Sequence, residues 1–167
     1  KYPETPQKVR EKIELINKSN QRMIILVDDL LNVSRIDQGK VQNEPALTDI
    51  CEIIKGAAQE MDAEAQKRKI SMELHLDSNI PKIMIDPKRF ADVVQNLLSN
   101  AVKYNVADGK AVITAMLVAN YLRISIEDNG IGIPKEDQSR VFSKFYRAAN
   151  ATKSDTTGSG LGLFVVK

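Results

Sequence analysis

Residues 86–104 read DPKRFADVVQNLLSNAVKY, and this stretch predicts one amphipathic helix. Asp86 is a suitable N-cap, and Pro87 suits the first turn, where proline removes no helical hydrogen bond. Apolar residues recur at helical spacing, which indicates a face that packs in a core. They are Phe90, Val93, Val94, Leu97, Leu98 and Ala101.

The same helix carries a polar stripe. Asn96, Asn100 and Lys103 share one side of it, because residues three or four apart lie above one another. Asparagine is a modest helix former whose amide has polar atoms to satisfy. Two amides in line with a lysine indicate a hydrated, anionic ligand. A solvated helix face is the competing interpretation, and segments further along the chain are needed to decide.

Composition restricts the class of protein. The 167 residues suffice for one domain with a substantial core and an appended element. The 24 basic and 22 acidic residues are too balanced to indicate binding to nucleic acid or to a charged membrane surface. The single cysteine excludes an internal disulfide and a multi-cysteine metal site. No apolar run approaches the roughly 18 residues of a membrane span, so a cytoplasmic setting is expected.

The periodicity of the chain predicts an α+β fold. A helical pattern over residues 5–40 has a heptad seam that needs a partner: another helix, another copy or the following domain. A second helix begins at Asp49, with Glu52 three residues on in the spacing of a capping box, and strands are predicted at 70–77, 83–85, 111–118 and 122–127. The expected architecture is a two-layer α/β sandwich with a mixed sheet, preceded by one long bundle or coiled-coil helix. The seam consists of Val9, Ile13, Ile16, Asn20, Met23, Val27, Leu30 and Ser34.

Two glycine-rich segments follow the last predicted strand. The first reads DNGIGIP at residues 128–134, where Asp128 can accept a hydrogen bond from an exocyclic amine such as that of adenine. Alone this pattern is weak, since tight turns use the same residues. The second reads GSGLGL at residues 158–163, and free N–H groups before a helix can bind phosphate. Neither a Walker A loop nor a dinucleotide fingerprint fits its spacing.

Together these segments resemble the sequence boxes of sensor histidine kinases. NLLSNAVKY at 96–104 resembles the N box, DNGIG at 128–132 the G1 box, FSKFYR at 142–147 the F box and GSGLGL at 158–163 the G2 box. LLNVSRIDQGK at 30–40 resembles the end of the second helix of the dimerisation and phosphoacceptor hairpin. The resemblance implies part of that hairpin at residues 1–42 and a catalytic ATP-binding domain of the Bergerat fold at residues 43–167.

The resemblance also implies a site for ATP or ADP with Mg²⁺. Asp128 would read the adenine amine, and Asn100 with Asn96 would hold Mg²⁺ bridging the phosphates. Lys103 and Arg147 would neutralise phosphate charge. The implied ATP-binding set is Asn96, Asn100, Lys103, Tyr104, Asp128, Gly130, Gly132, Ile133, Arg147, Gly158, Ser159, Gly160, Leu161 and Gly162. Core packing is the competing interpretation for Tyr104 and Phe142.

The sequence departs from the family pattern in ways that limit these expectations. The family's phosphoacceptor histidine has no counterpart, and no catalytic residue is assigned with certainty. The only histidine, His75, falls on the polar side of a predicted strand and is expected to be an exposed strand residue. The family's last strands have no counterpart either, so the domain reads as C-terminally truncated. Asp92 stands where glutamine is common, and Asn105 where serine or threonine is common.

The implied activity is therefore transfer of the γ-phosphate of ATP to a histidine outside this chain, for onward transfer to an aspartate of a response-regulator receiver domain. A homodimer through the N-terminal helix is expected, together with a cytoplasmic location in a parent protein that can be membrane-anchored, and no nucleic-acid partner. The alternatives are a non-catalytic regulatory or dimerisation scaffold with the same fold, and another ATPase of the same superfamily.

Overall fold

The computed structural model describes residues 7–39, 42–154 and 158–167. The chain divides into two compact units, Lys1–Val41 and Gln42–Lys167. Residues 1–6 and 40–41, which belong to the segment expected as residues 1–42, lie outside the described part of the chain. The same holds for residues 155–157, between the F box and the G2 box.

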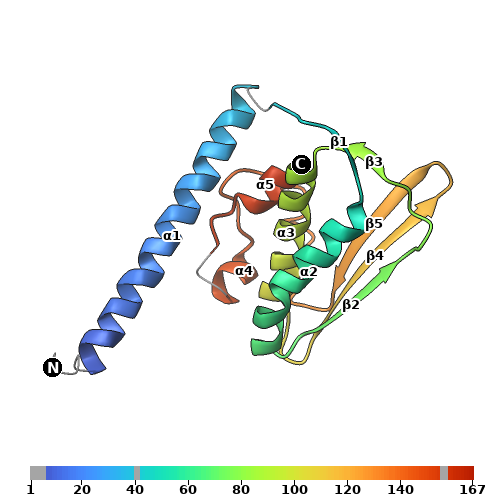
Figure 1. The fold of residues 1–167 in the computed structure, drawn as a ribbon. Coiled ribbons are helices and arrows are strands. Elements are labelled where there is room, and N and C mark those ends of the chain that lie inside the picture. The colour runs from blue at the N-terminus through green and yellow to red at the C-terminus, as the bar shows by residue number, and fades with distance from the viewer. Residues whose placement is uncertain (1–6, 40–41, 155–157) are drawn as a thin grey trace, which may run out of the picture. The chain divides into compact units, whose positions relative to one another are not determined.

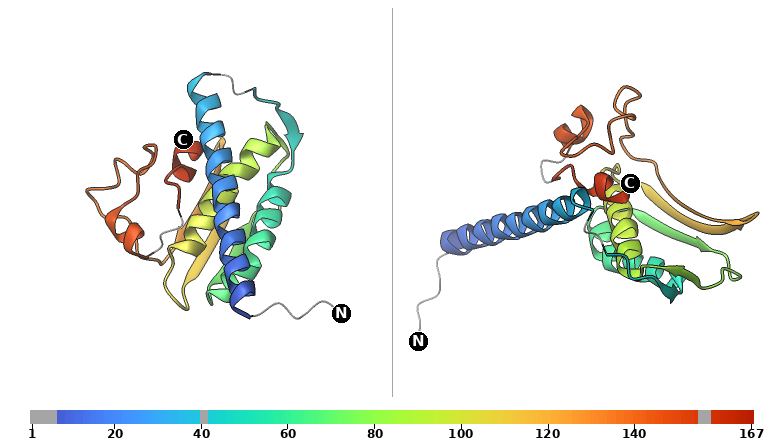
Figure 2. Two further views of the ribbon diagram at one scale, coloured as in Figure 1. Left: turned by 90° about the vertical axis from the view of Figure 1, so that its left-hand side faces the viewer. Right: turned by 90° about the horizontal axis from the view of Figure 1, so that it is seen from above.

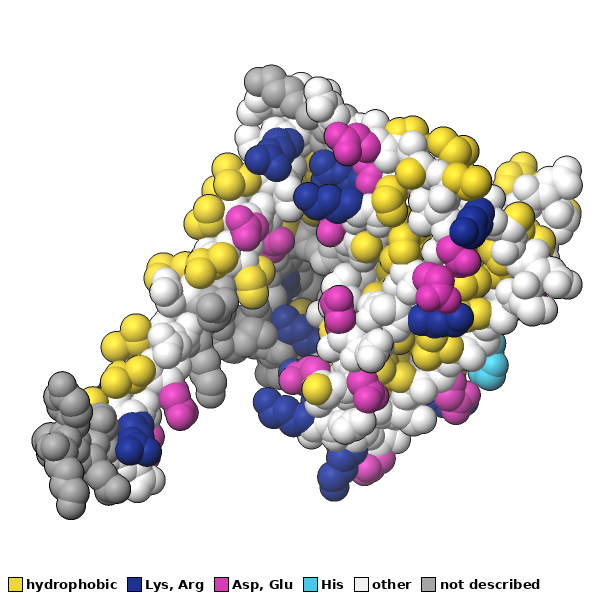
Figure 3. All heavy atoms as spheres, in the orientation of Figure 1, with side chains coloured by type: hydrophobic (Ala, Val, Ile, Leu, Met, Phe, Trp, Pro, Cys, Tyr) yellow, Lys and Arg dark blue, Asp and Glu magenta, His cyan; other side chains and the backbone are white. Residues whose placement is uncertain are grey.

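The first unit is a single long helix, α1 (Gln7–Asp37). Its seam side chains remain exposed: Ile16 keeps 65 % of its surface, Val27 55 % and Leu30 53 %. Apolar side chains accordingly gather along the helix in the space-filling view (Figure 3). An amphipathic helix with an exposed apolar face has the pattern of a bundle or coiled-coil element. No helix among the described residues is both long and apolar enough to cross a membrane.

The second unit is a two-layer sandwich. Its main sheet has the strand order β2 (Ser71–Leu76), β4 (Lys110–Val118), β5 (Tyr121–Asp128). β2 runs parallel to β4 and β5 runs antiparallel to it, so the sheet is mixed. The helices α2 (Ile50–Lys67) and α3 (Pro87–Lys103) cover one face of this sheet (Figures 1 and 2). This arrangement confirms the predicted fold class.

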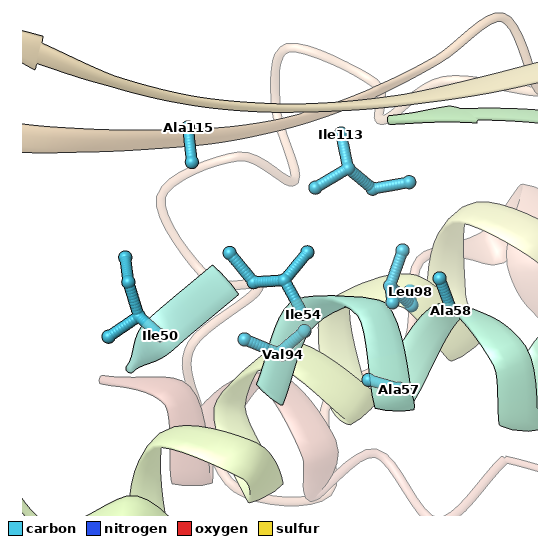
Figure 4. Packing of buried hydrophobic residues seen from close by; sticks show 8 residues of the cluster. All are labelled: Ile50, Ile54, Ala57, Ala58, Val94, Leu98, Ile113 and Ala115. Atoms are coloured by element: carbon cyan, nitrogen blue, oxygen red, sulfur yellow. The ribbon is translucent and has the colours of Figure 1, made fainter. Parts of the chain in front are cut away.

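The core lies between these two layers. Ile54 of α2, Leu98 of α3 and Ile113 of β4 are each 0 % exposed and pack in one cluster with Val94 (Figure 4). Full burial of one such side chain stabilises a fold by about 1.5–3 kcal/mol. The cluster therefore fixes the buried face of α3 and leaves its polar stripe on another side.

Both predicted helix caps are present. Asp49 accepts hydrogen bonds from the N–H groups of Cys51 and Glu52, at 3.1 and 3.4 Å. Asp86 accepts from Lys88 and Arg89, each at 3.0 Å. Each cap satisfies N–H groups that have no partner inside the helix, which fixes where the helix begins.

Four short elements complete the description of the unit. β1 (Ala46–Thr48), which the sequence analysis did not predict, pairs antiparallel with β3 (Ile83–Ile85) in a separate small sheet. α4 (Ala149–Ser154) lies in the polar stretch after the F box, where no helix was predicted. α5 (Gly162–Val166) begins within the G2 box and packs near α3.

Candidate nucleotide site

The C-terminal half of α3 brings the polar stripe to the G2 box. If position 158 carried a Cβ atom in place of glycine, that atom would lie 3.0 Å from Tyr104 Oη and 3.4 Å from both Lys103 Nζ and Arg147 Nε. Residues from the N box, the F box and the G2 box therefore meet at one point. Two of these side chains are cationic and lie close to the glycine backbone, which suits a phosphate chain bound by side-chain cations and backbone N–H groups.

Asn96 faces the other end of the G2 box. Its Nδ2 donates to Asp92 O of its own helix at 2.9 Å, which turns the amide oxygen outward. A Cβ at Gly162 would lie 2.7 Å from this Oδ1 atom, so the oxygen and the glycine are in close contact. An amide oxygen is a ligand type that Mg²⁺ accepts beside phosphates and water. The Asn96 donor chemistry thus fits the expected ion.

The remaining predicted metal residue, Asn100, lies one turn further along α3. Its backbone oxygen accepts from Tyr104 N at 2.9 Å, and its side chain is half-buried. Among the described residues, no group of three or more His, Cys, Asp or Glu side chains is placed to hold a metal ion.

The G1 box lies against the end of α3. Asp128 ends β5, and its Oδ1 accepts from Gly130 N at 2.9 Å. Ile131 N donates to Tyr104 O at 3.0 Å, and a Cβ at Gly130 would lie only 2.3 Å from that same oxygen. No side chain fits at Gly130 without moving the backbone. The close approach of the two boxes explains glycine at this position better than turn formation alone.

The lid base, residues 142–151, contacts both the G1 box and the G2 box. Asn150 Nδ2 donates to Gly132 O at 2.9 Å and to Ile131 O at 3.4 Å, which connects α4 to the G1 box. Arg147 Nη2 donates to Ala151 O at 3.2 Å. Phe145 and Gly160 both have positive φ, 59° and 73°, and a Cβ at Gly160 would lie 2.7 Å from the Phe145 carbonyl carbon. The F box and G2 box thus touch through their backbones.

A second hydrogen bond in this region involves Tyr146, whose hydroxyl donates to Asp137 Oδ1. That hydrogen bond, with burial and the negative charge of Asp137, raises the pKa of Tyr146. The Arg140 guanidinium lies 4.3 Å from the centroid of the same ring, within cation–π range. These contacts fix the turn that leads into the F box.

The structure distributes the other predicted residues unevenly. Leu161 is 1 % exposed, so only its backbone can reach a ligand, and its N–H bonds to Ser159 Oγ at 3.3 Å. Ile133 keeps 46 % of its surface exposed and Phe142 43 %, so neither is a core residue. His75 is 61 % exposed on β2, and its Nε2 lies 3.4 Å from Glu73 Oε2.

Two asparagines near the site carry structural bonds that sequence reasoning missed. Asn129 Oδ1 accepts from Lys110 N at 2.7 Å, and Asn105 Nδ2 donates to Lys110 O at 3.0 Å. Asn105 was noted only as a departure from a family pattern. Asn105 adjoins the N box and Asn129 lies within the G1 box, yet nothing in the sequence indicates that both bond to the backbone of the same residue of a third segment.

Comparison with known proteins agrees with this geometry. Residues 85–167, which include every segment of the candidate site, match the family described as histidine kinase-, DNA gyrase B-, and HSP90-like ATPase. The chain is 32 % identical over 165 residues to the sensor protein RprX of Bacteroides fragilis, with 98 % of the chain and 32 % of RprX covered. It is 30 % identical over 155 residues to the alginate biosynthesis sensor protein KinB of Pseudomonas aeruginosa, with 93 % and 25 % covered. The chain belongs to the sensor histidine kinase family.

Solved structures of this family share the fold. Full-length ShkA, crystallised with AMPPNP, superposes with a TM-score of 0.79 at 26 % identity, covering 94 % of this chain and 32 % of ShkA. The histidine kinase AdeS of Acinetobacter baumannii has a TM-score of 0.75 at 28 % identity, covering 97 % and 72 %. The chain spans about a quarter to a third of the length of the curated relatives named above. It contains an ATP-binding domain of the kind found in sensor histidine kinases.

Proposed function

We propose that this chain binds Mg²⁺-ATP and presents its γ-phosphate for transfer to a histidine of a sensor histidine kinase. The observation that carries the proposal is the meeting of Lys103, Tyr104 and Arg147 around Gly158. Phosphoryl transfer depends mainly on positioning the phosphates and neutralising their charge. A glycine between two cations and a hydroxyl supplies both conditions.

Each side of the site has a separate task in this proposal. Lys103 and Arg147 neutralise the phosphates, and backbone N–H groups of residues 158–162 hydrogen-bond to them. Asp128 accepts the adenine amine through the carboxylate oxygen that Gly130 does not use. Asn96 and Asn100 hold Mg²⁺, which, when bound, neutralises phosphate charge. AMPPNP bound to the related ShkA supports a nucleotide in this fold.

We place the phosphate acceptor on another segment. His75, the only histidine of the chain, lies on β2 beside Glu73. It lies outside the N, G1, F and G2 boxes. A separate histidine would take the γ-phosphate and pass it to an aspartate of a response-regulator receiver domain. Because the substrate is ATP, we expect this reaction to take place in the cytoplasm.

A thermal-shift titration with AMPPNP, with and without Mg²⁺, tests the proposal. A ligand that binds only the folded state stabilises it by about 2.7 kcal/mol at a hundred times its dissociation constant. We expect a saturable rise in Tm that is larger with Mg²⁺, and an Asn96→Leu, Asn100→Leu double variant should lose the Mg²⁺-dependent part. A chain that shows no nucleotide-dependent shift would be a non-catalytic scaffold with the same fold.

We also propose that α1 forms a homodimer through its heptad seam. The support is the exposure of Ile16, Val27 and Leu30 at seam spacing. Sedimentation velocity across a concentration series should show a dimer. The Ile16→Glu, Val27→Glu double variant should remain monomeric, because it places charges in the seam. Ile25, 58 % exposed but outside the seam, provides the control: Ile25→Glu should dimerise normally.

A further inference from the structure

The backbone of Lys110, the first residue of β4, connects the two segments that flank the adenine side of the site. Its N–H donates to Asn129 Oδ1 at 2.7 Å. Its carbonyl oxygen accepts from Asn105 Nδ2 at 3.0 Å and from Asn129 N at 3.3 Å. Asn105 directly follows the N box and Asn129 lies within the G1 box. We refer to these three residues as the Lys110 junction.

The Asn129 side chain supplies one hydrogen bond of the β4–β5 ladder in place of the Asn129 backbone. β4 and β5 pair up to Ala111 and Asp128, and the next pair would be Lys110 with Asn129. Opposed residues of a hydrogen-bonded antiparallel pair exchange two backbone bonds. Here one of them is the backbone bond from Asn129 N, and the Asn129 side-chain oxygen supplies the other. The side chain satisfies the Lys110 N–H, and the backbone carbonyl of residue 129 is released to turn into the glycine segment.

This turn sets the direction of the Asp128 carboxylate. Gly130 N, two residues after Asp128, donates to Asp128 Oδ1 at 2.9 Å. A shift of the turn moves this N–H group, and with it the carboxylate rotamer. Gly130 is in turn in close contact with Tyr104 O, so the turn has little freedom on that side. The bond from Lys110 N to Asn129 Oδ1 constrains the start of this turn, while Ile131 N to Tyr104 O and the two bonds of Asn150 constrain its end.

Asn105 fixes the opposite side of the junction. Its Oδ1 accepts from Val106 N at 2.9 Å, while its Nδ2 reaches Lys110 O. A Cβ at Gly109 would lie 2.1 Å from Asn105 Oδ1, so the loop between α3 and β4 closes tightly around this amide. The amide therefore links the end of α3 to the start of β4.

We propose that Asn129 and Asn105 are positioning residues: they orient the Asp128 carboxylate toward the base and so set selectivity for a purine with an amine at its six-position. This inference rests on the proposed function, in which Asp128 accepts that amine. Adenine carries the amine at its six-position, whereas hypoxanthine carries a carbonyl there. A correctly aimed carboxylate attracts the first and repels the second.

Calorimetric titration of the 167-residue chain with Mg²⁺-ATP and Mg²⁺-ITP tests the inference. The unsubstituted chain should prefer ATP by about tenfold or more, the size of one charge-assisted hydrogen bond. In Asn129→Ala the preference should fall to about twofold, while ITP affinity changes little, because the phosphate contacts are separate. Asn129→Asp keeps the acceptor oxygen and should retain the preference. Any effect of the added charge on triphosphate binding cancels in the ratio.

A matched control is Asn120→Ala, in the turn at the far end of the β4–β5 hairpin, which should leave both affinities unchanged. An unchanged ATP/ITP ratio in Asn129→Ala would overturn the inference. So would an equal loss for both nucleotides, or a loss of preference in Asn129→Asp, because these results would show a general structural role.

A second variant keeps the test decisive where Asn129→Ala has no cooperative thermal transition. Asn105→Asp retains an acceptor for Val106 N and replaces the donor to Lys110 O with a carboxylate oxygen, so it should lower the preference about threefold. An unchanged ratio would again contradict the inference. Failure of the unsubstituted chain to bind ATP would instead overturn the proposed function, and the inference with it.

Discussion

Two sides of the candidate site are held in different ways. The G1 side, formed by residues 104–110 and 128–132, is fixed by backbone bonds to α3 and β4, such as Ile131 N to Tyr104 O at 3.0 Å. The lid side, formed by residues 142–151 and 158–162, depends on side chains such as Asn150 and on the contact of Phe145 with Gly160. Backbone ladders resist local opening better than isolated side-chain bonds. The base would therefore meet a preformed surface, and the phosphates an adjustable one.

The difference has a functional meaning. Selectivity for a base needs a carboxylate held in one direction, whereas a kinase must admit ATP and release ADP. In the proposed function the G1 side recognises the base, and the lid side opens to admit ATP and release ADP. Substitutions of matched kind on the two sides can separate these roles.

The largest effect should come from Gly130→Ala. Its Cβ would lie 2.3 Å from Tyr104 O and 2.9 Å from Asn105 Cα, both backbone atoms that cannot rotate away. We expect the free energy of unfolding to fall by about 3 kcal/mol, the range of overpacking, with loss of ATP binding. Chemical denaturation measures it. Gly132→Ala is the control: φ is 64° but the space is open, so only the strain of about 1–2 kcal/mol applies. Equal losses of unfolding free energy at both positions would show that the backbone of the G1 side moves to accommodate the added methyl group.

A smaller loss of stability should follow Gly160→Ala on the lid side. The position combines a φ of 73° with a Cβ 2.7 Å from the Phe145 carbonyl carbon, so backbone strain adds to a steric conflict. Backbone bonds within the described lid side join residues three or four apart, such as Ser143 N to Arg140 O at 2.8 Å and Thr152 N to Ala148 O at 3.0 Å, so we expect this side to move instead of destabilising the domain. We expect the free energy of unfolding to fall by about 1–2 kcal/mol relative to the unsubstituted chain, and ATP affinity to fall roughly tenfold. A destabilisation larger than that of Gly130→Ala would reverse the comparison.

Removal of the Asn150 amide should have a modest effect on ligand release. Its bonds to the Gly132 and Ile131 carbonyls join α4 to the G1 side. In Asn150→Ala we expect ATP to dissociate about threefold to tenfold faster in stopped-flow displacement, with Tm nearly unchanged, since this contact is exposed. An unchanged dissociation rate would indicate that α4 does not restrain the lid.

The smallest effect concerns the start of α3, which supports the G1 side. Hydrogen bonds from the N–H groups of Glu44, Arg89 and Lys88 lower the pKa of Asp86. A carboxylate with a depressed folded-state pKa stabilises the fold above its unfolded value of about 3.9, and loses this contribution as pH falls below it. The Tm difference between the unsubstituted chain and Asp86→Ala should therefore be full at pH 6 and shrink toward pH 3. A constant difference would mean that the carboxylate charge is unimportant. Asp77→Ala is the matched control for loss of an exposed carboxylate.

The fold could be predicted where local chemistry decides it. Asp49 and Asp86 were predicted as caps and are caps, because the bonds they make are local in sequence. β1 was missed because its three residues are too few to show an alternation, and only Thr48 is buried. α4 was missed because its residues, ANATKS, carry no apolar stripe.

The candidate site, too, could be predicted from the sequence only in part. The boxes indicated which residues would gather, and Lys103, Tyr104, Arg147 and Gly158 do meet. The roles of Asn129 and Asn150 could not be predicted, since each bonds to a backbone group brought close by the tertiary fold, 19 and 18 residues away in sequence. Asn105 bonds to a residue only five positions away, and its partner depends on the conformation of the loop between them. Short polar side chains near a turn have many candidate partners in sequence, and the structure selects one.

The central claim is that Asp128, held on the rigid G1 side, recognises the base of ATP. The most direct test is the calorimetric Kd of Mg²⁺-ATP for Asp128→Asn against the unsubstituted chain. Asparagine keeps an oxygen for Gly130 N and presents an amide donor toward the adenine amine. We predict an unchanged Tm without ligand and a Kd raised at least about tenfold. An Asp128→Asn variant that folds normally and binds Mg²⁺-ATP with unchanged affinity would contradict the account.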